Sequence, residues 1–187
     1  MTGPRERLLA TAVTLIRERG VAGTGLAELL KESGTARGSI YQHFPRGKDD
    51  LVAAAVAEAG TDGRATLATL RALGDPAVVV TAIMHAARDT LDADGYVHGC
   101  PIAAGALAGP DYPAVVGTAG DALAGWVEEL AGVLAATGMA AEAASPFASL
   151  VISVFEGALV QARASRSPAP FDAAADQLAL LARAQLA

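Results

Sequence analysis

The sequence is poor in cysteine, in aromatic residues and in long apolar runs. Of its 187 residues, one is cysteine and 4% are aromatic. A single thiol excludes an intrachain disulfide framework and is typical of a reducing compartment. No basic start is followed by an apolar leader, and no run of about 18 apolar residues is free of charge, glycine and proline. We therefore expect a cytoplasmic protein without a membrane segment.

The core has to be built from small and aliphatic side chains. Hydrophobic residues make up 52% of the chain, alanine is abundant, and runs of β-branched residues are few. This composition favours helices. Apolar residues recur at helical spacing, whereas the alternation typical of strands is almost absent. We expect an all-α fold of about nine helices.

Positive charge is scarce overall but unevenly placed. The chain carries 14 Lys and Arg against 20 Asp and Glu, which by itself argues against a nucleic-acid partner. Residues 1–48 nevertheless hold eight basic and four acidic residues, a net charge of +4, whereas the remainder holds six basic and sixteen acidic residues, a net charge of −10. Phosphate attraction depends on the local patch, so a small basic head on an acidic body is compatible with DNA binding.

Local breaks and caps predict how the head is built. Helices are expected at 4–20, 26–33 and 36–43, with Thr24 as the N-cap of the second and Gly34 in the turn before the third. Three short helices with a glycine turn between the last two form a helix-turn-helix. We predict a DNA-binding domain at 1–47 and a larger helical domain at 48–187, which begins with a linker helix.

Helix starts in the body are indicated either by an N-cap residue followed by proline or by apolar periodicity. Asp75-Pro76 and Ser145-Pro146 each pair an N-cap residue with proline at the first helical position. These pairs predict helices at 76–93 and 146–165. Pro101 opens a short helix, and apolar periodicity predicts two more at 113–137 and 170–186.

Two motifs follow the first two helices of the head, namely Arg37-Gly38-Ser39-Ile40-Tyr41-Gln42-His43-Phe44 and Lys48-Asp49-Asp50-Leu51. In these helices and motifs, which cover about residues 5–56, the head resembles the TetR family of bacterial transcriptional repressors. The join between the two motifs and two residues of the second helix are similar to the LmrA/YxaF-like branch: Pro45-Arg46-Gly47, Leu30 and Ser33. Two body motifs support that branch more weakly, Gly99-Cys100-Pro101-Ile102 and Phe155-Glu156-Gly157-Ala158-Leu159.

Eight residues are predicted to contact DNA. If the third helix enters the major groove, its first residues face base edges, and the guanidinium of Arg37 can bond guanine O6 and N7. Gly38 permits a close approach of the backbone. Tyr41 and His43 resemble the phosphate clamps of the family, and Lys48 can hold a phosphate together with the amides that begin its helix. The full set is Thr24, Arg37, Gly38, Ser39, Tyr41, Gln42, His43 and Lys48.

Plainer interpretations of these residues stay open. Arg37 is also compatible with a phosphate contact or a solvated side chain, Tyr41 with packing against the first helix, and Thr24 with capping alone. Ile40 and Phe44 are expected to form the small core of the head.

Helix 146–165 is apolar on two faces, so both faces must be buried. We expect one face to pack against a second subunit, where the last helix completes a four-helix interface, although a central core helix would show the same pattern. The predicted interface residues are Phe147, Leu150, Val151, Val154, Ala158, Phe171, Leu178 and Leu181.

The family resemblance implies that the body, at 48–187, is a ligand-binding and dimerisation domain. It binds a small effector, and this binding releases the head from its DNA operator. Because the body has a net charge of −10 and few cations, a neutral or weakly basic, largely apolar effector is favoured. The predicted lining, whose pattern is also typical of plain core, is Met84, Ile102, Leu107, Trp126, Leu130, Phe155 and Leu159. The sequence thus indicates a homodimeric repressor of an inverted-repeat DNA operator, with no cofactor.

Other functions remain as alternatives. Within the family, the chain is also compatible with an activator or with a regulator whose effector promotes DNA binding. Outside it stand a small enzyme that uses Cys100 as nucleophile with a histidine base, and a helical scaffold that no longer contacts DNA. His98-Gly99-Cys100 is too sparse for a zinc site, so no metal and no catalytic residue is predicted.

Overall fold

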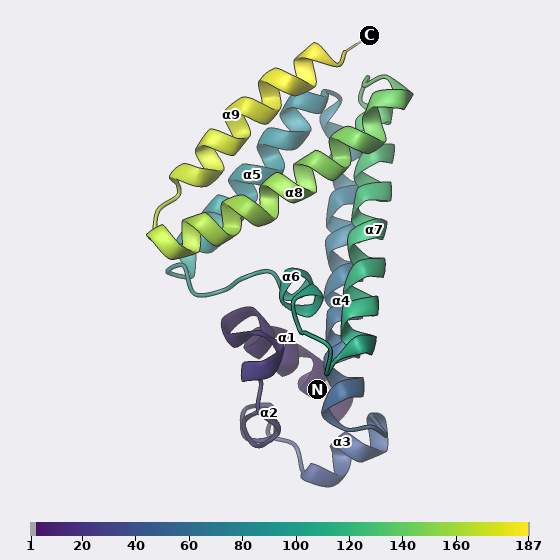
Figure 1. Ribbon diagram of the computed structural model, residues 1–187, viewed down its shortest axis with the longest axis vertical. Coiled ribbons are helices and arrows are strands. Elements are labelled where there is room, and N and C mark those ends of the chain that lie inside the picture. Colours follow the sequence, from purple (N-terminus) through teal and green to yellow (C-terminus); the bar gives the residue numbers. More distant parts are fainter. Residues whose placement is uncertain (1–2, 187) are drawn as a thin grey trace. The chain divides into compact units, whose positions relative to one another are not determined.

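Within residues 3–186, which the computed structural model describes, the regular structure is helical apart from one isolated bridge, Met139 to Leu186. The prediction of an all-α fold is confirmed (Figure 1). Besides a short 3-10 helix, Leu70–Leu73, the elements are α1 (Pro4–Gly23), α2 (Leu26–Ser33), α3 (Arg37–His43), α4 (Lys48–Thr69), α5 (Pro76–Ala93), α6 (Pro101–Ala106), α7 (Pro113–Ala136), α8 (Ala141–Ser165) and α9 (Ala169–Ala184).

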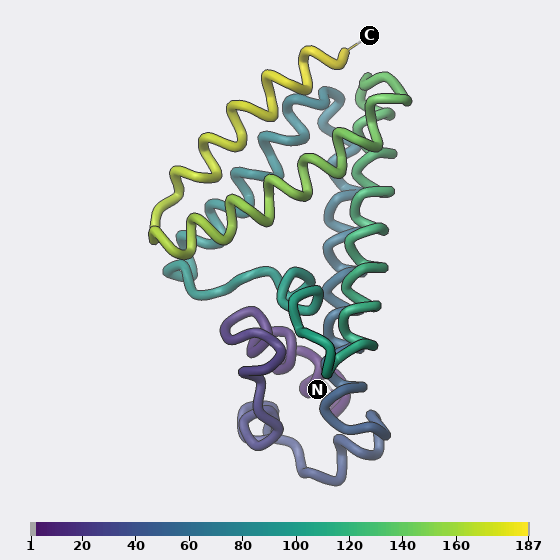
Figure 2. The backbone as a smooth tube through the Cα atoms, in the orientation of Figure 1, coloured from purple at the N-terminus to yellow at the C-terminus, as the bar shows by residue number. Residues whose placement is uncertain are grey.

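The chain forms two compact units. The first, called the head unit, comprises residues 1–62 and 99–123, and the second, called the bundle unit, comprises residues 63–98 and 124–187. The boundary passes through α4 and α7, so each of these long helices contributes to both units. An extended segment connects α5 to α6, as Figure 2 shows.

Within the head unit, α6 is tied to α1 by a reciprocal pair of hydrogen bonds. The Gly99 amide donates to the Arg17 carbonyl over 2.8 Å, and the Arg17 Nε donates to the Gly99 carbonyl over 3.2 Å. Further along α6, Gly105 is buried against Val56 of α4 and Ala119 of α7. The short helix α6 is therefore part of the head's own packing.

The first two helices begin and end close to the predicted residues, with one correction. Helical geometry in α1 breaks at Gly20, which has φ 73° and ψ 176°, and α2 covers the predicted 26–33. The prediction that Thr24 caps α2 is wrong, because Gly25 occupies the N-cap position. A final helical turn of α1 follows Gly20 and ends at Gly23. The hydroxyl of Thr24, the next residue, donates a hydrogen bond to the Gly20 carbonyl over 2.8 Å.

The two proline starts of the bundle unit differ in outcome. Asp75 caps α5 as predicted, its Oδ1 accepting the Ala77 amide over 2.6 Å. The predicted start of α8 at Ser145-Pro146 is wrong, because the helix begins at Ala141 and contains Pro146. The preceding residues 141–144 are good helix formers. Because proline has no amide proton, one backbone carbonyl in the preceding turn lacks its helical hydrogen bond, but this carbonyl lies near the exposed start of the helix.

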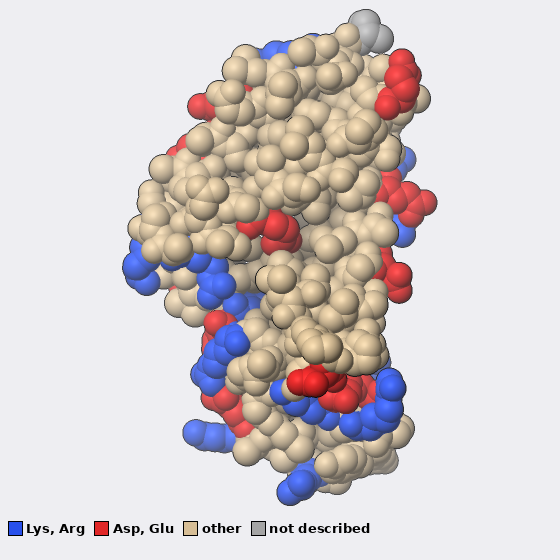
Figure 3. Space-filling view, in the orientation of Figure 1, with Lys and Arg blue, Asp and Glu red and all other residues tan. Residues whose placement is uncertain are grey.

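In the bundle unit, α9 packs on α5 and α8 (Figure 1). The core of this unit includes Phe171, which has no exposed surface and meets Phe155 edge to face at a centroid distance of 6.0 Å. The helix α8 is long and apolar enough to cross a membrane by length and composition, a test that core helices also pass. In the view of Figure 3, the surface over α8 and α9 carries few charged side chains.

Candidate nucleic-acid interface

The seven residues of α3 divide into a buried side and an exposed side. Ile40 is fully buried and Phe44, which follows the helix, is 3% exposed, so these two form the inner side as predicted. The exposed side, called here the outer face of α3, consists of Arg37, Gly38, Tyr41, Gln42 and His43. Ser39 is half-buried. One short helix therefore presents a polar surface to solvent while two apolar side chains anchor it.

The turn before α3 is held by backbone geometry and by α1. Gly34 adopts the left-handed conformation, with φ 61°, which a residue with a side chain rarely adopts. The carbonyl of Ser33 accepts a hydrogen bond from the Arg7 Nε of α1 over 3.1 Å, and the Ser33 and Thr35 hydroxyls lie 2.8 Å apart. These contacts fix the direction in which α3 leaves the turn.

The turn after α3 places Tyr41 beside the start of α4. Gly47 has φ 70°, and a Cβ atom at this position would lie 3.2 Å from the Tyr41 Cε1. The Tyr41 ring therefore packs on this turn, and 48% of the residue stays exposed. Lys48 follows directly as the first residue of α4.

Lys48 is held by a residue that the sequence did not single out. Its Nζ donates to the Tyr112 Oη over 3.3 Å and lies 5.2 Å from the centroid of the Tyr112 ring. Tyr112 belongs to the loop between α6 and α7, 64 residues away. No sequence signal indicates this contact, because only the folding of the head unit brings the two residues together.

Most of the head's cations have partners inside the protein. Arg19 pairs with Glu28, Arg17 with the Gly99 carbonyl, and Arg46 with Asp50, whose Oδ1 lies 2.6 Å from the arginine Nε. In the last pair, Arg46 lies in the turn before α4 and Asp50 in the first turn of that helix. By contrast, the Arg37 side chain is exposed and forms no ion pair or hydrogen bond with any residue in the range that the structure describes.

The Arg46–Asp50 pair also shifts a titration. The Arg46 amide donates to the Asp50 carboxylate over 2.8 Å, and this bond, followed by the guanidinium bond, lowers the pKa of Asp50 from its ordinary 3.8. Asp50 thus remains negatively charged and forms an ion pair with Arg46. This pair reduces the net positive charge beside α3.

Gly38 has open space around it. Apart from the backbone of its own helix and its chain neighbours, a Cβ atom built on this residue would meet no atom within 4 Å, so the glycine does not relieve crowding with α2. Exposed helical glycine destabilises a helix by about 1 kcal/mol relative to alanine. Packing within the chain therefore does not account for a glycine here.

Thr24 differs from the other predicted DNA contacts. It has no exposed surface, and its hydroxyl is engaged by the Gly20 carbonyl. A phosphate outside the protein cannot reach a side chain that is fully covered. The structure therefore leaves seven of the eight predicted residues with accessible surface, namely Arg37, Gly38, Ser39, Tyr41, Gln42, His43 and Lys48.

The predicted effector-pocket residues fall into both units. Ile102, fully buried, and Leu107, 85% exposed, lie in the head unit. In the bundle unit, Met84 and Leu130 are fully buried, Leu159 is 8% exposed, and Trp126 and Phe155 are half-buried. Trp126 covers Gly63 of α4.

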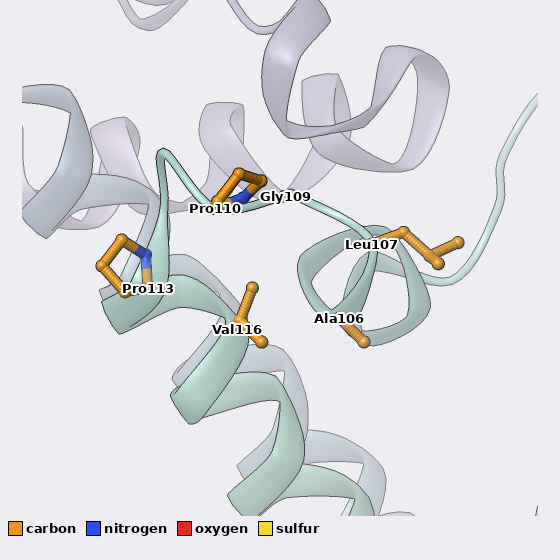
Figure 4. A pocket seen from close by; sticks show the side chains of 6 residues that line it. All are labelled: Ala106, Leu107, Gly109, Pro110, Pro113 and Val116. Carbon is orange, nitrogen blue, oxygen red and sulfur yellow. The ribbon is translucent and has the colours of Figure 1, made fainter.

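Leu107 lines an open hollow of about 560 Å³ between α6 and α7 (Figure 4). Its walls are apolar and consist of Ala106, Leu107, Gly109, Pro110, Pro113 and Val116. Two of these residues, Pro110 and Pro113, flank the loop position of Tyr112.

The predicted interface residues of α8 and α9 are partly core and partly surface. Phe147, Val151, Ala158, Phe171 and Leu178 are buried within the bundle unit of one chain. Leu150 is 41% exposed, Leu181 is 47% exposed, and Val154 is half-buried. Exposed apolar residues nearby in sequence are Val160, 66% exposed, and Leu180, 57% exposed.

The residues with potential for other chemistry have contacts within the chain. The Cys100 Sγ accepts the Ala103 amide at the start of α6, over 3.5 Å. In the bundle unit, the His98 Nδ1 lies 2.9 Å from the Asp94 Oδ2. Among residues 3–186, no group of three or more His, Cys, Asp or Glu side chains is placed to hold a metal ion.

Known proteins place this architecture in a family. Residues 8–55 match the profile of bacterial regulatory proteins of the tetR family, and residues 76–177 match the C-terminal domain of LmrA/YxaF-like transcriptional regulators. An uncharacterized HTH-type transcriptional regulator of Mycobacterium tuberculosis is 33% identical over 100% of this chain and 97% of its own length. The regulator LmrA of Bacillus subtilis is 41% identical over 43% of each chain.

Solved structures share the fold. A TetR transcriptional regulator from Legionella pneumophila superposes with a TM-score of 0.84 over 95% of this chain and 96% of its own, at 23% identity. This likeness shows the fold, and the two profiles together cover the head and most of the body. The chain belongs to the TetR family of bacterial transcriptional regulators, whose head is a DNA-binding helix-turn-helix, and within that family it has the LmrA/YxaF-like C-terminal domain.

Proposed function

We propose that this chain is a ligand-responsive repressor, which acts in the cytoplasm and binds an inverted-repeat operator as a homodimer. The outer face of α3 supports this proposal most directly, because it is exposed and carries a cation without an ion pair and a glycine that no packing requires. Two such faces would enter successive major grooves on one side of the duplex, about 34 Å apart.

Some residues of the head would contact DNA bases, and others would contact the phosphate backbone of the DNA. Arg37 is proposed to read a guanine, while Gly38 lets the start of α3 approach the base edges closely. Ser39 and Gln42, one helical turn apart, would contact bases or phosphates. Tyr41, His43 and Lys48 would donate to phosphates, which set register and contribute most of the salt-dependent affinity.

The dimer would form through α8 and α9. Leu150 and Leu181, the exposed members of the predicted interface, supply apolar surface on these two helices, and so do Val160 and Leu180. Two helices from each chain would form a four-helix interface around a two-fold axis. A dimer doubles the phosphate contacts, which one small head cannot supply in sufficient number.

The effector would be small, largely apolar and neutral or weakly basic. The acidic body disfavours anions, and the hollow beside Leu107 offers apolar walls that are open to solvent. An effector releases DNA only if it binds the DNA-free conformation more tightly. Matched pairs of compounds, one neutral and one carboxylated, would test the class in an operator-release assay. Tighter operator binding in the presence of effector would identify a co-repressor-dependent regulator instead.

The operator can be found by footprinting the purified protein on genomic DNA. The expected result is an inverted repeat, bound more weakly as salt rises from about 50 to 200 mM. The Arg37→Ala variant should lose at least tenfold in affinity for this operator, because a good bidentate contact contributes about 1–3 kcal/mol. The dimer should stay intact.

The matched control is Arg183→Ala. Arg183 is an exposed arginine of α9 that forms no ion pair with any described residue, so its removal changes net charge equally. Equal losses in the two variants would show that only the overall charge matters and would contradict base reading by α3.

A further inference from the structure

The contact between Lys48 and Tyr112 lies within the head unit and joins the start of α4 to the loop between α6 and α7. The Tyr112 Oη accepts the ammonium over 3.3 Å, and the ring lies 5.2 Å from it. Lys48 and Tyr112 are both half-buried. The flexible lysine side chain is thus ordered by a hydrogen bond to the phenol hydroxyl of one aromatic residue.

The loop that carries Tyr112 is itself well braced. Its turn is closed by the Tyr112 amide, which donates to the Gly109 carbonyl over 3.2 Å, and Gly109 has φ 84°. On the other side, the Tyr112 carbonyl accepts the Val116 amide over 3.1 Å at the start of α7. Pro110 and Pro113 remove further backbone freedom. The phenol is therefore presented from a fixed backbone.

The chemistry of the partner matters for Lys48. A carboxylate would order the ammonium but cancel its charge, whereas a phenol orders it and leaves the positive charge for another anion. One of the three ammonium protons is used by Tyr112, and two remain. Two acidic residues follow Lys48 in the sequence. Asp50 is bound by Arg46, and Asp49 is exposed to solvent.

We infer that Tyr112 is a positioning residue for DNA binding, which orders the Lys48 ammonium for a phosphate before DNA arrives. This inference rests on the proposed phosphate contact of Lys48. Immobilising a long side chain opposes binding, so a lysine that is ordered in the free protein binds with less loss of entropy. The role belongs to a residue outside the helix-turn-helix.

The test is a double-mutant cycle in the full-length protein, with operator affinity measured by fluorescence anisotropy. Tyr112→Phe keeps the ring but removes the acceptor, and it should weaken binding by about two- to tenfold per head. The salt dependence should not change, because no charge is lost. Lys48→Met should weaken binding and lower the slope of log K against log salt by about 0.9 per head. On the Lys48→Met background, Tyr112→Phe should have no further effect.

The matched control is Tyr96→Phe, which removes a tyrosine hydroxyl that donates to Asp92 in the bundle unit and should leave operator affinity unchanged. Unchanged or tighter binding by Tyr112→Phe, or an equal loss on both Lys48 backgrounds, would overturn the inference and leave the proposed function standing. If Lys48→Met binds as the wild type does while Arg37→Ala fails, the lysine contact and the inference fall together. A wild-type protein that binds no operator would refute the proposed function itself.

Discussion

Replacing Gly38 with alanine should make the head more stable and the operator complex weaker. Apart from its chain neighbours and the backbone of its own helix, the added methyl group would meet no atom of the protein within 4 Å, and the residue lies in regular helix. Glycine destabilises a helix interior by about 0.8–1.0 kcal/mol relative to alanine, and near the first turn of a short helix we expect about 0.5–1 kcal/mol. For a chain of this length, that gain corresponds to an increase of about 1–4 °C in Tm.

The same methyl group should interfere with DNA. If the start of α3 approaches base edges through Gly38, a methyl group there separates the helix from the groove and weakens neighbouring contacts. We expect at least a tenfold loss of operator affinity, about 1.4 kcal/mol. Calorimetry and fluorescence anisotropy on the same preparation would measure the two effects, which have opposite signs.

The control is Gly120→Ala in α7, where the glycine is also exposed, helical and surrounded by open space. It should stabilise the protein similarly and leave operator binding unchanged. A Gly38→Ala protein that is more stable and binds the operator as tightly as the wild type would refute the placement of the outer face of α3 against DNA.

Three further predictions concern stability and assembly. Asp75→Ala removes the cap of α5 and should lower the free energy of unfolding by about 1 kcal/mol in urea titrations; an unchanged midpoint would show that the cap contributes nothing. Asp50→Asn should destabilise the protein near neutral pH, because the pKa of Asp50 is lowered in the folded state by its bonds from Arg46. That contribution is present above the ordinary pKa of 3.8 and is lost as the pH falls through the lower folded value, so wild type and variant should converge in acid; a difference that persists there would contradict it. Leu181→Glu places a charge on exposed apolar surface of α9 and should convert dimer to monomer in sedimentation experiments, whereas a variant that stays dimeric would move the proposed interface elsewhere.

Elements set by local interactions were predictable from the sequence. The end of α2 at Gly34, the capped start of α5 and the break before Lys48 follow from residues within a few positions of each other. The burial of Ile40 and Phe44 follows from helical periodicity. Predictions failed where two local signals competed, as at Ser145-Pro146, where preceding helix formers extended α8 past the proline signal.

The sequence by itself determined the fold class, the helix-turn-helix and the family, because these depend on periodicity, caps and a contiguous motif. Only the tertiary structure decided which polar residues have surface or partners. It buried Thr24, tied Arg46 to Asp50, left Arg37 without an ion pair among the described residues, and brought Tyr112 to Lys48. The physical reason is that charge and composition count residues along the chain, whereas availability for binding depends on which atoms the folded chain places next to them.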